Sequence, residues 1–404
     1  MKSTLPVQHL LERHRQQFPA LANKAYFNYG GQGPMPQAAL AALQQAHLHI
    51  QQVGPFSNNS NTWIHQETQQ TRQTIATELG TTAETITLTD SVSTGCNIAL
   101  WGIEWQPSDR ILITDCEHQS IIATVQEIQR RFGVVVDVCP LLATLNQGDP
   151  VAAIAEHLSA NTRLVVLSHI LWNTGQVLPL GEMVQACHAY PTQQHPIQVL
   201  VDAAQSVGVL PLDLAALEVD FYAFTGHKWW CGPAGVGGLY IRPEALETLQ
   251  PTFIGWRGIT TDANGQPSGW ERGGKRFEVA TSDYALYPAL RVAIATQSEW
   301  GSIEARYQRI QSLSAYLWQQ LRELRSVHCL RTTAPEAGLV SFQLVDQVSG
   351  RSHRQLAQFL ESQEVMIRTI LNPDCVRACV HYLTLESEID RLVAGVQQFC
   401  QTVG

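Results

Sequence analysis

Short apolar, β-branched runs alternate with helix-like segments through the middle of the chain. Five runs have this character: ILIT (111–114), VVVDV (134–138), RLVVLSHI (163–170), IQVLVDAA (197–204) and VDFYAFTG (219–226). The first two are joined by QSIIATVQEIQRRF, whose apolar residues are spaced as on one face of a helix. Runs that are apolar on both faces and joined by crossovers predict a mainly parallel α/β sheet covered by helices on both sides.

The pattern differs on either side of this region. Before it come a predicted amphipathic helix at 6–17, the turn-rich loop YFNYGGQGPMP at 26–36 and a helical segment at 37–52. After about residue 242 come a Gly- and charge-rich stretch, a long helical segment and a smaller α+β portion. We therefore expect two domains: a large α/β domain over 24–260, and a small α+β domain formed by 1–23 and 261–404.

Composition narrows the class of ligand. The 404 residues are 45% hydrophobic and 15% charged, and the net charge is -9 without a dense Lys/Arg cluster, which argues against nucleic-acid and anionic-membrane surfaces. Nine scattered cysteines are typical of reduced thiols. The first residues lack the apolar core of a signal peptide, and no apolar stretch reaches the ~18 residues of a membrane helix, so we expect a cytoplasmic protein with a small-molecule substrate.

Two polar residues follow neighbouring predicted strands. Asp202 ends one apolar run, and Lys228 comes 26 residues later, after the next. Alone, Asp202 could be a helix N-cap and Lys228 a solvated residue at a strand end. Because ligands of parallel sheets bind at the carboxyl ends of the strands, the two side chains could instead share one cleft. A lysine amine and a buried carboxylate together suit pyridoxal phosphate, whose aldehyde forms a Schiff base with lysine and whose pyridine nitrogen pairs with the acid.

Such a site also needs a phosphate anchor and a flat group beside the ring. Ser93, Thr94 and Gly95 lie between a strand-like run and a helix-like one, where hydroxyls and backbone N–H groups can bind an anion. A plain helix cap is the alternative interpretation. His118 follows the predicted strand at 111–114 and could stack on the ring, or be merely structural.

Taken together, the motifs resemble a known family. YFNYGGQGPMP, STGCN, DCEHQS, VDAAQSVG, TGHKWWCGPAGVGGLYI, RFEVAT and VRACVHYLTLESEID occur in the order found in class V aminotransferase-like enzymes of pyridoxal phosphate fold type I. That group includes cysteine desulfurases, isopenicillin N epimerase-like proteins and cystine C-S lyases, and the Lys228 region is most similar to the last of these. The resemblance covers nearly the whole chain.

The resemblance implies a role for each matching residue. Lys228 would be the Schiff-base lysine, Asp202 the partner of the pyridine nitrogen, Gln205 a donor to the ring hydroxyl oxygen, and His118 the stacking ring. Ser93, Thr94, Gly95, Thr225 and His227 would hold the phosphate, and Thr281 would reach the phosphate of a neighbouring subunit, which implies a homodimer. Arg377 would bind the substrate α-carboxylate and Arg368 a second acidic group.

Two departures from the family pattern matter. LWNTG places Trp172 where the family often has asparagine, which leaves the ring contact of the following Asn173 open. The segment RTILNPDCVR, 368–377, is shorter than in desulfurases, so its Cys375 is poorly suited to act as a mobile thiolate nucleophile. We therefore expect β-elimination of L-cystine or L-cysteine to pyruvate, ammonia and a persulfide or sulfide.

Other functions remain as alternatives. A cysteine desulfurase or selenocysteine lyase would yield alanine, an epimerase or aminotransferase is a third choice, and a non-enzymatic scaffold a fourth. A sulfur acceptor protein and a role in iron–sulfur cluster assembly follow only from the family likeness. GPAGVGGLY contains no dinucleotide-binding G-x-G-x-x-G. Cys375, Cys379 and His381 lack a fourth metal ligand and are more simply strand residues, so no metal is expected.

Overall fold

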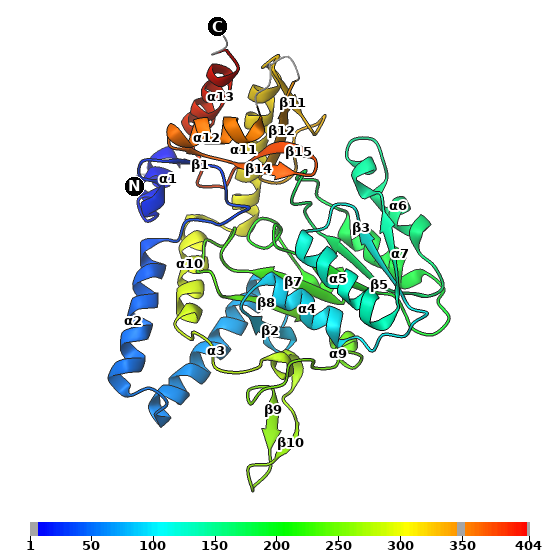
Figure 1. Cartoon of the computed structure of the whole chain (residues 1–404). Helices are drawn as coiled ribbons and strands as arrows, with labels where there is room; N and C mark the ends of the chain where they lie inside the picture. The colour runs from blue at the N-terminus through cyan, green and yellow to red at the C-terminus, as the bar shows by residue number, and fades with distance from the viewer. Residues whose placement is uncertain (1–6, 346–351, 402–404) are drawn as a thin grey trace, which may run out of the picture.

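A seven-stranded sheet forms the centre of the protein, whose computed structural model describes residues 7–345 and 352–401 (Figure 1). The strand order is β2 (Ile86–Thr89), β8 (Gly237–Ile241), β7 (Phe221–Thr225), β6 (Gln198–Asp202), β5 (Thr162–Ser168), β3 (Arg110–Thr114) and β4 (Val135–Cys139). Only β8 runs against the others, because both of its pairings are antiparallel. The predicted mainly parallel α/β sheet is confirmed.

Successive side chains along a strand point to opposite faces of the sheet, so they belong to two different cores. In β7, Phe221 and Ala223 pack on one face, and Tyr222 and Phe224 on the other. The first face is covered by α4 (Val92–Gly102) and α5 (Gln119–Phe132). The second is covered by α3 (Asn58–Glu78), α6 (Pro150–His157), α7 (Leu180–Ala189) and α10 (Leu286–Trp300). Helix α5 has the bounds that its periodicity predicted.

The C-terminal part builds a second, antiparallel sheet, seen at the top of Figure 1. Its order is β11 (Val327–Cys329), β12 (Leu339–Leu344), β15 (Asp374–Cys379) and β14 (Arg368–Leu371). The helices α11 (Ile303–Arg322), α12 (His353–Ser362) and α13 (Glu386–Gln401) pack against it. Cys375 and Cys379 thus lie on a strand, and the described residues contain no cluster of three or more metal-ligating side chains.

The remaining elements join or flank the two sheets. The helices are α1 (Val7–Arg15), α2 (Gln37–Val53), α8 (Leu214–Leu217) and α9 (Pro243–Leu246). Strand β1 (Ala25–Tyr26) pairs with β13 (Val365–Met366), and β9 (Ile259–Thr261) with β10 (Pro267–Trp270). The short 3-10 turns are Pro19–Leu21, Ala83–Thr85, Leu141–Thr144 and Gly273–Phe277. Within the described residues no helix is both long and apolar enough to cross a membrane.

The packing bears on where the two domains meet. Ala25 and Phe27 belong to the core of the small sheet, whereas Leu290 and Ile294 of α10 belong to the core of the large sheet. The division at 24–260 stays a prediction, and this clustering favours boundaries near residues 29 and 301. A further cluster, which includes Tyr29, Trp229 and Leu339, joins the two parts.

Candidate active site

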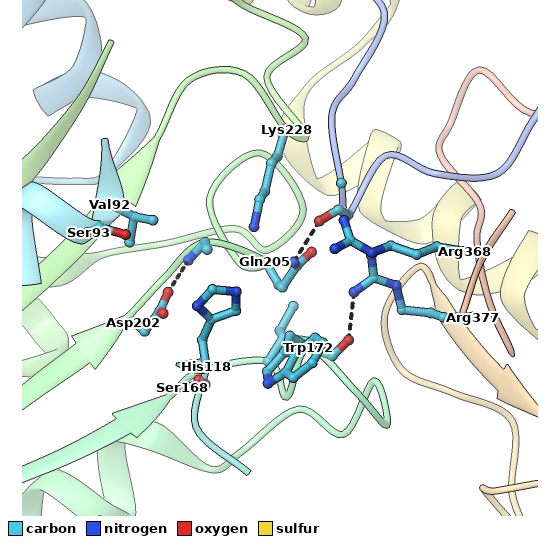
Figure 2. A pocket seen from close by; sticks show the side chains of 14 residues that line it. Val92, Ser93, His118, Ser168, Trp172, Asp202, Gln205, Lys228, Arg368 and Arg377 are labelled. Carbon is cyan, nitrogen blue, oxygen red and sulfur yellow. Dashed lines mark hydrogen bonds between the residues drawn. The ribbon is translucent and has the colours of Figure 1, made fainter. Parts of the chain in front are cut away.

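A cavity of about 200 Å³ lies at the carboxyl ends of the central strands (Figure 2). Its walls come from both parts of the chain: Gly30, Gly31, Val92, Ser93, His118, Ser168, Ile170, Trp172, Asp202, Ala204, Gln205, Lys228, Arg368 and Arg377. The structure thus brings together the predicted pair Asp202 and Lys228 with Ser93, His118, Gln205 and both arginines. Short polar segments after parallel strands converge here because the strands all end at the same edge of the sheet.

Asp202 and Lys228 are placed by neighbouring strands. Asp202 is the last residue of β6, where it is in register with Ser168 of β5, and its Oδ1 accepts a hydrogen bond of 2.9 Å from the N–H of Ala204. Lys228 follows the end of β7 by three residues. Burial lowers the pKa of Lys228 to about 8; Asp202 opposes this shift, and Arg377 and Arg368 add to it. A substantial fraction of this amine is therefore neutral near pH 8.

Gln205 is held by one group that can only accept a hydrogen bond and one group that can only donate a hydrogen bond. Its Nε2 donates to the carbonyl oxygen of Gly30 at 2.9 Å, and its Oε1 accepts from the indole N–H of Trp229 at 2.9 Å. Gly30 leaves room for both side chains, because an added Cβ would lie 2.9 Å from both Gln205 Oε1 and Arg377 Nη2 and would displace them. The close approach of three segments therefore shapes this wall.

His118 caps a helix and also lines the cavity. It is the N-cap of α5: its Nδ1 accepts from the backbone N–H of Ser120 at 3.3 Å and lies 2.9 Å from that residue's hydroxyl. Its ring meets that of Trp172 edge to face, with centroids 5.5 Å apart. Burial lowers the pKa of His118, with Asp202 opposing, so the ring is largely neutral near pH 7. A neutral imidazole can lie flat against an aromatic ligand.

A buried acid stands behind His118. Glu117 Oε1 accepts from the backbone N–H of Ser168 at 3.2 Å, and Glu117 Oε2 accepts from the Ser168 hydroxyl at 3.0 Å. Thr114 also donates to Glu117, at 2.5 Å. Burial raises the pKa of Glu117 to about 8, with hydrogen bonds from Thr114 and Ser168 opposing the shift and Asp202 adding to it. Neither Glu117 nor Ser168 was predicted from the sequence, although Glu117 comes three residues after the predicted strand 111–114 and Ser168 lies within the predicted strand 163–170.

The predicted phosphate residues surround the start of α4. Ser91 caps this helix by accepting from the N–H of Thr94 at 3.2 Å, and the Thr94 hydroxyl donates to Asp90. Of the predicted residues only Ser93 lines the cavity; Gly95 is buried, with Ala223 Cβ 3.0 Å from where its own Cβ would lie. The free N–H groups at this helix start favour an anion.

Thr225 and His227 stand apart from the cavity wall. The Thr225 hydroxyl and the Nδ1 of His227 are 2.7 Å apart, and neither residue lines the cavity. Their phosphate role stays a prediction.

Both predicted substrate arginines come from the small sheet. Arg368 of β14 and Arg377 of β15 are directly opposite each other in the antiparallel pairing, so their side chains share one face. Arg377 is only 1% exposed and donates from Nη1 to the carbonyl oxygen of Trp172 at 2.6 Å. Its buried Nε has no hydrogen-bond partner among the described residues, whereas Arg368 is solvent-exposed. Two guanidinium groups therefore stand ready for acidic groups of a ligand.

The structure separates Trp172 from Asn173. Trp172 lines the cavity and donates from its indole N–H to the carbonyl of Cys116 at 3.0 Å. Asn173 does not line the cavity: its amide donates to the carbonyl oxygen of Asn372 at 3.1 Å, and its Oδ1 is buried without a partner among the described residues. The ring contact expected of Asn173 therefore has no geometric support, because the chain turns its side chain toward the small sheet.

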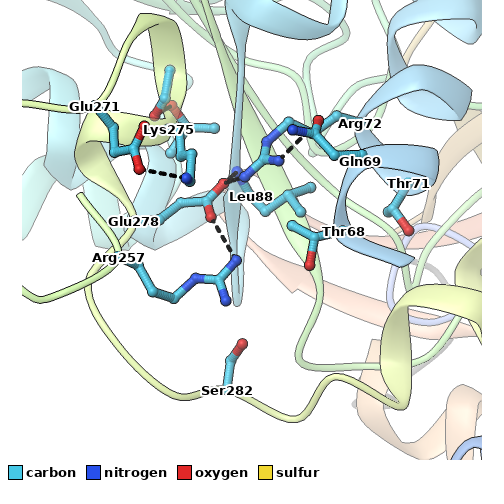
Figure 3. A network of polar contacts seen from close by, with 12 residues as sticks. Thr68, Gln69, Thr71, Arg72, Leu88, Arg257, Glu271, Lys275, Glu278 and Ser282 are labelled. Atoms are coloured by element: carbon cyan, nitrogen blue, oxygen red, sulfur yellow. Dashed lines mark hydrogen bonds and ion pairs between the residues drawn. The ribbon is translucent and has the colours of Figure 1, made fainter. Parts of the chain in front are cut away.

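Thr281 lies in a different hollow. It lines a cavity with Thr94, Asp90 and Tyr287, and its side chain is exposed. The segment carrying it is anchored by Glu278, which accepts from Arg72, from Arg257 at 3.3 Å and from the N–H of Leu88 at 3.1 Å (Figure 3). Thr281 thus lies beside Thr94 of α4, one of the residues predicted to hold the phosphate, but outside the cavity that contains Lys228.

Among the residues that the structure describes, which include all nine cysteines, no cysteine lines the cavity that contains Lys228. All nine cysteines are free thiols, and every one except the half-buried Cys400 is buried. Burial raises the pKa of Cys375 to about 12, opposed by Arg377. The thiol nearest the arginines in sequence is therefore protonated and enclosed.

The residues present fit pyridoxal phosphate. A lysine with a lowered pKa can join its aldehyde, a strand-end carboxylate can pair with its ring nitrogen, and a helix start with hydroxyl groups can bind its phosphate. The partnerless Nε of Arg377 adds a donor for a substrate carboxylate. Such a set, at the strand ends of a mainly parallel sheet, defines a lysine-dependent pyridoxal phosphate enzyme.

The chain belongs to the class-V aminotransferase family, whose sequence model matches residues 25–392. It is similar to the cystine C-S lyase C-DES, solved in complex with its reaction product cysteine persulfide: 52% identity, TM-score 0.92, with 95% of this chain and 99% of that one covered. A cysteine desulfurase of Klebsiella pneumoniae is 29% identical over 98% of this chain and 99% of its own length. Isopenicillin N epimerase of Streptomyces clavuligerus is 27% identical over 90% and 92%.

Proposed function

We propose that this protein is a pyridoxal phosphate-dependent C-S lyase that cleaves L-cystine or L-cysteine by β-elimination to pyruvate, ammonia and a persulfide or sulfide. The observation that carries the proposal is a cavity with Lys228, Asp202 and two arginines but no cysteine in its walls. The 52% identity to C-DES supports the same reaction. A desulfurase would need a thiolate that can reach the substrate sulfur.

Lys228 is the base of the reaction. Bound pyridoxal phosphate supplies an electron sink that makes the substrate Cα–H bond acidic. The Nζ of Lys228, which burial keeps partly neutral, would accept the Cα proton of a substrate in the cavity. The sulfur substituent would leave Cβ with the electron pair of the broken bond, and water would hydrolyse the released aminoacrylate to pyruvate and ammonia.

The other cavity residues hold reactants in place. Asp202 is placed to keep the ring nitrogen protonated, His118 to stack on the ring, and Gln205 to donate to the ring oxygen. Ser93 and the start of α4 are placed for the phosphate. These are proposed roles, supported by the convergence of all four residues on one cavity.

The arginines select the substrate class. Arg377, buried and partly free of partners, binds the α-carboxylate, and exposed Arg368 on the same face binds the distal carboxylate of cystine. The persulfide released from cystine is also a better leaving group than an alkyl thiolate. Cystine therefore suits the pair of arginines better than cysteine does.

Cysteine desulfurase is the second candidate. The Klebsiella relative bears that name, and such an enzyme would release alanine instead of pyruvate. Against it stands Cys375, whose thiol is buried and has a raised pKa. A selenocysteine lyase, an epimerase or an aminotransferase would use the same lysine, and no contact in the cavity favours one of them.

We also propose a homodimer in which Thr281 reaches the phosphate of the second subunit. Large apolar side chains that are exposed around Thr281 support it: Phe253 and Val279 line the same hollow as Thr281, and Trp256 lines a neighbouring hollow with it. A cytoplasmic location and delivery of sulfur to an acceptor protein, including iron–sulfur assembly, are further proposals consistent with reduced thiols and a sulfur-releasing reaction.

Borohydride labelling tests the cofactor site directly. Purified protein incubated with pyridoxal phosphate and then reduced should carry the pyridoxyl group on the peptide containing Lys228. Only four lysines occur in the sequence, so Lys275 serves as an internal control that should remain unlabelled. Labelling of Lys275 with Lys228 untouched would contradict the assignment.

A further inference from the structure

Trp229 follows the proposed cofactor lysine and is completely buried. Its carbonyl oxygen accepts from the amide Nε2 of Gln297 at 2.9 Å and lies 3.3 Å from Nε2 of His381. Its ring stacks on Tyr29, with centroids 6.1 Å apart, and Tyr29 stacks in turn on His381 at 4.4 Å. The indole therefore has one well-defined position behind the cavity.

The indole N–H determines how the Gln205 amide is turned. Indole nitrogen can only donate and a backbone carbonyl can only accept, so the atom of Gln205 facing Trp229 must be oxygen and the atom facing the Gly30 carbonyl must be nitrogen. Both contacts are 2.9 Å, and neither survives rotation of the amide by half a turn. Trp229 and Gly30 together thus exclude the flipped amide.

One N–H group of Gln205 is left over. A side-chain amide has two N–H donors, and the only acceptor of Gln205 Nε2 among the described residues is the Gly30 carbonyl. Gln205 lines the cavity and lies between Lys228 and the arginines in Figure 2. The free N–H is thus available to a ligand on the cavity side.

We propose that Trp229 is a positioning residue that fixes Gln205 so that it presents an N–H donor, and not its carbonyl oxygen, to the phenolic oxygen of the bound cofactor. This rests on the proposed cofactor site. A donor at that oxygen stabilises its ionised form and so makes the neighbouring lysine-linked nitrogen easier to deprotonate. Trp229 thereby lowers the pKa of the lysine-linked nitrogen without touching the substrate.

The test is a pH titration of the visible absorbance of the cofactor-loaded protein. In Trp229→Phe the ring remains but the indole donor is lost, so the apparent pKa of the absorbance should rise by several tenths of a unit. The cofactor dissociation constant should rise about fivefold, the scale of one neutral hydrogen bond. Gln205→Leu should raise the apparent pKa at least as far. Adding Trp229→Phe to Gln205→Leu should change it no further, because the two residues act through one contact.

Trp230→Phe is the matched control. Trp230 is equally buried, but its ring packs against Phe224 at 5.7 Å on the large-sheet side. It should leave the apparent pKa unchanged. If Trp229→Phe does not fold, replacement of Trp229 by β-(3-benzothienyl)alanine removes the N–H and keeps the ring shape.

Two results would overturn the inference alone: a wild-type apparent pKa without the indole N–H, or an equal shift with and without Gln205. Absence of any lysine-bound cofactor in the wild-type protein would overturn the proposed function and the inference together.

Discussion

Lys228 shows how burial and charge set the chemistry of one amine. Burial disfavours the ammonium form and lowers the pKa of Lys228. The charge of Asp202 raises this pKa in part, and the positive charges of Arg377 and Arg368 lower it further. The result is a lysine that can be both nucleophile and base near neutral pH. Asp202 and Lys228 could be predicted from the sequence because Asp202 ends one buried strand and Lys228 comes three residues after the next.

This lysine should leave a pH signature on stability. Its folded-state pKa of about 8 lies below its ordinary value of 10.5, so between these pH values the unfolded chain binds more protons and stability rises with pH. Below about pH 8 the amine is charged in both the folded and the unfolded state, so the full free-energy cost of burying the charged lysine is present. Cofactor-free Lys228→Met should therefore be more stable than cofactor-free wild type at pH 7, by up to about 3 kcal/mol, with the gap shrinking toward pH 10.5.

Urea denaturation of both proteins from pH 7 to pH 10 measures this gap. Lys275→Met, which removes a half-buried lysine paired with Glu271, serves as the control. A stability gap for Lys228→Met that stays constant with pH would contradict the lowered pKa.

Other residue contacts could not be predicted in this way. The Trp229–Gln205–Gly30 arrangement joins three segments, and the resulting amide orientation depends on backbone positions that no local pattern encodes. Asn173 shows the same limit, because its neighbour Trp172 takes the cavity wall. Glu117 and Ser168 were missed although Glu117 comes three residues after β3 and Ser168 ends β5.

Among the elements, the segment after the 3-10 turn Gly273–Phe277 is held by one buried acid. Glu278 bridges Arg72 of α3 and Arg257, and also accepts from the backbone of β2 (Figure 3). Glu278→Gln leaves two enclosed guanidinium groups without their counter-charge. It should lower the free energy of unfolding by about 3 kcal/mol, measured by urea denaturation.

Glu271→Gln is the matched control for that variant. Glu271 pairs with Lys275 and is 30% exposed, so its loss should cost less than about 1 kcal/mol. Equal losses for the two variants would show that Glu278 does not anchor the segment.

Strands and helices with strong patterns were predictable, and those without were not. The five apolar runs and α5 matched the structure. Burial dictates the composition of α5 and of the inner strands, whereas β4 at the sheet edge is only partly buried. Strand β8 was not among the predicted strands. Gly237 needs to be glycine because a Cβ there would lie 2.4 Å from the carbonyl oxygen of Phe224, so close packing removed the side-chain pattern. The β9–β10 hairpin has mostly exposed residues and no core face to reveal it.

At the scale of the molecule, the cavity that contains Lys228 lies where the two sheets meet. Arg368 and Arg377 come from the small sheet and Asp202 from the large one. The fold class could be predicted from the alternation of strand-like and helix-like segments. The proximity of the arginines to Lys228 was expected only from the family resemblance. Sequence spacing carries no signal for contacts between residues about 150 positions apart.

The exposed apolar residues near Thr281 predict a dimer. Light scattering of the purified protein should give the mass of two chains, and Trp256→Asp should shift it toward one, since Trp256 is 57% exposed. Val138→Asp, on the sheet-edge strand β4 and 53% exposed, should leave the mass unchanged. A wild-type protein with the mass of one chain would contradict the dimer and the proposed role of Thr281.

The proposed function requires that Lys228 drives β-elimination without a cysteine nucleophile. The most direct measurement incubates cofactor-loaded protein with L-cystine and quantifies pyruvate, alanine and persulfide together, beside Lys228→Ala. We expect pyruvate and persulfide in equal amounts from the wild type, no alanine, and no turnover by the variant. Alanine as the main product, or activity retained in Lys228→Ala, would contradict the proposed function.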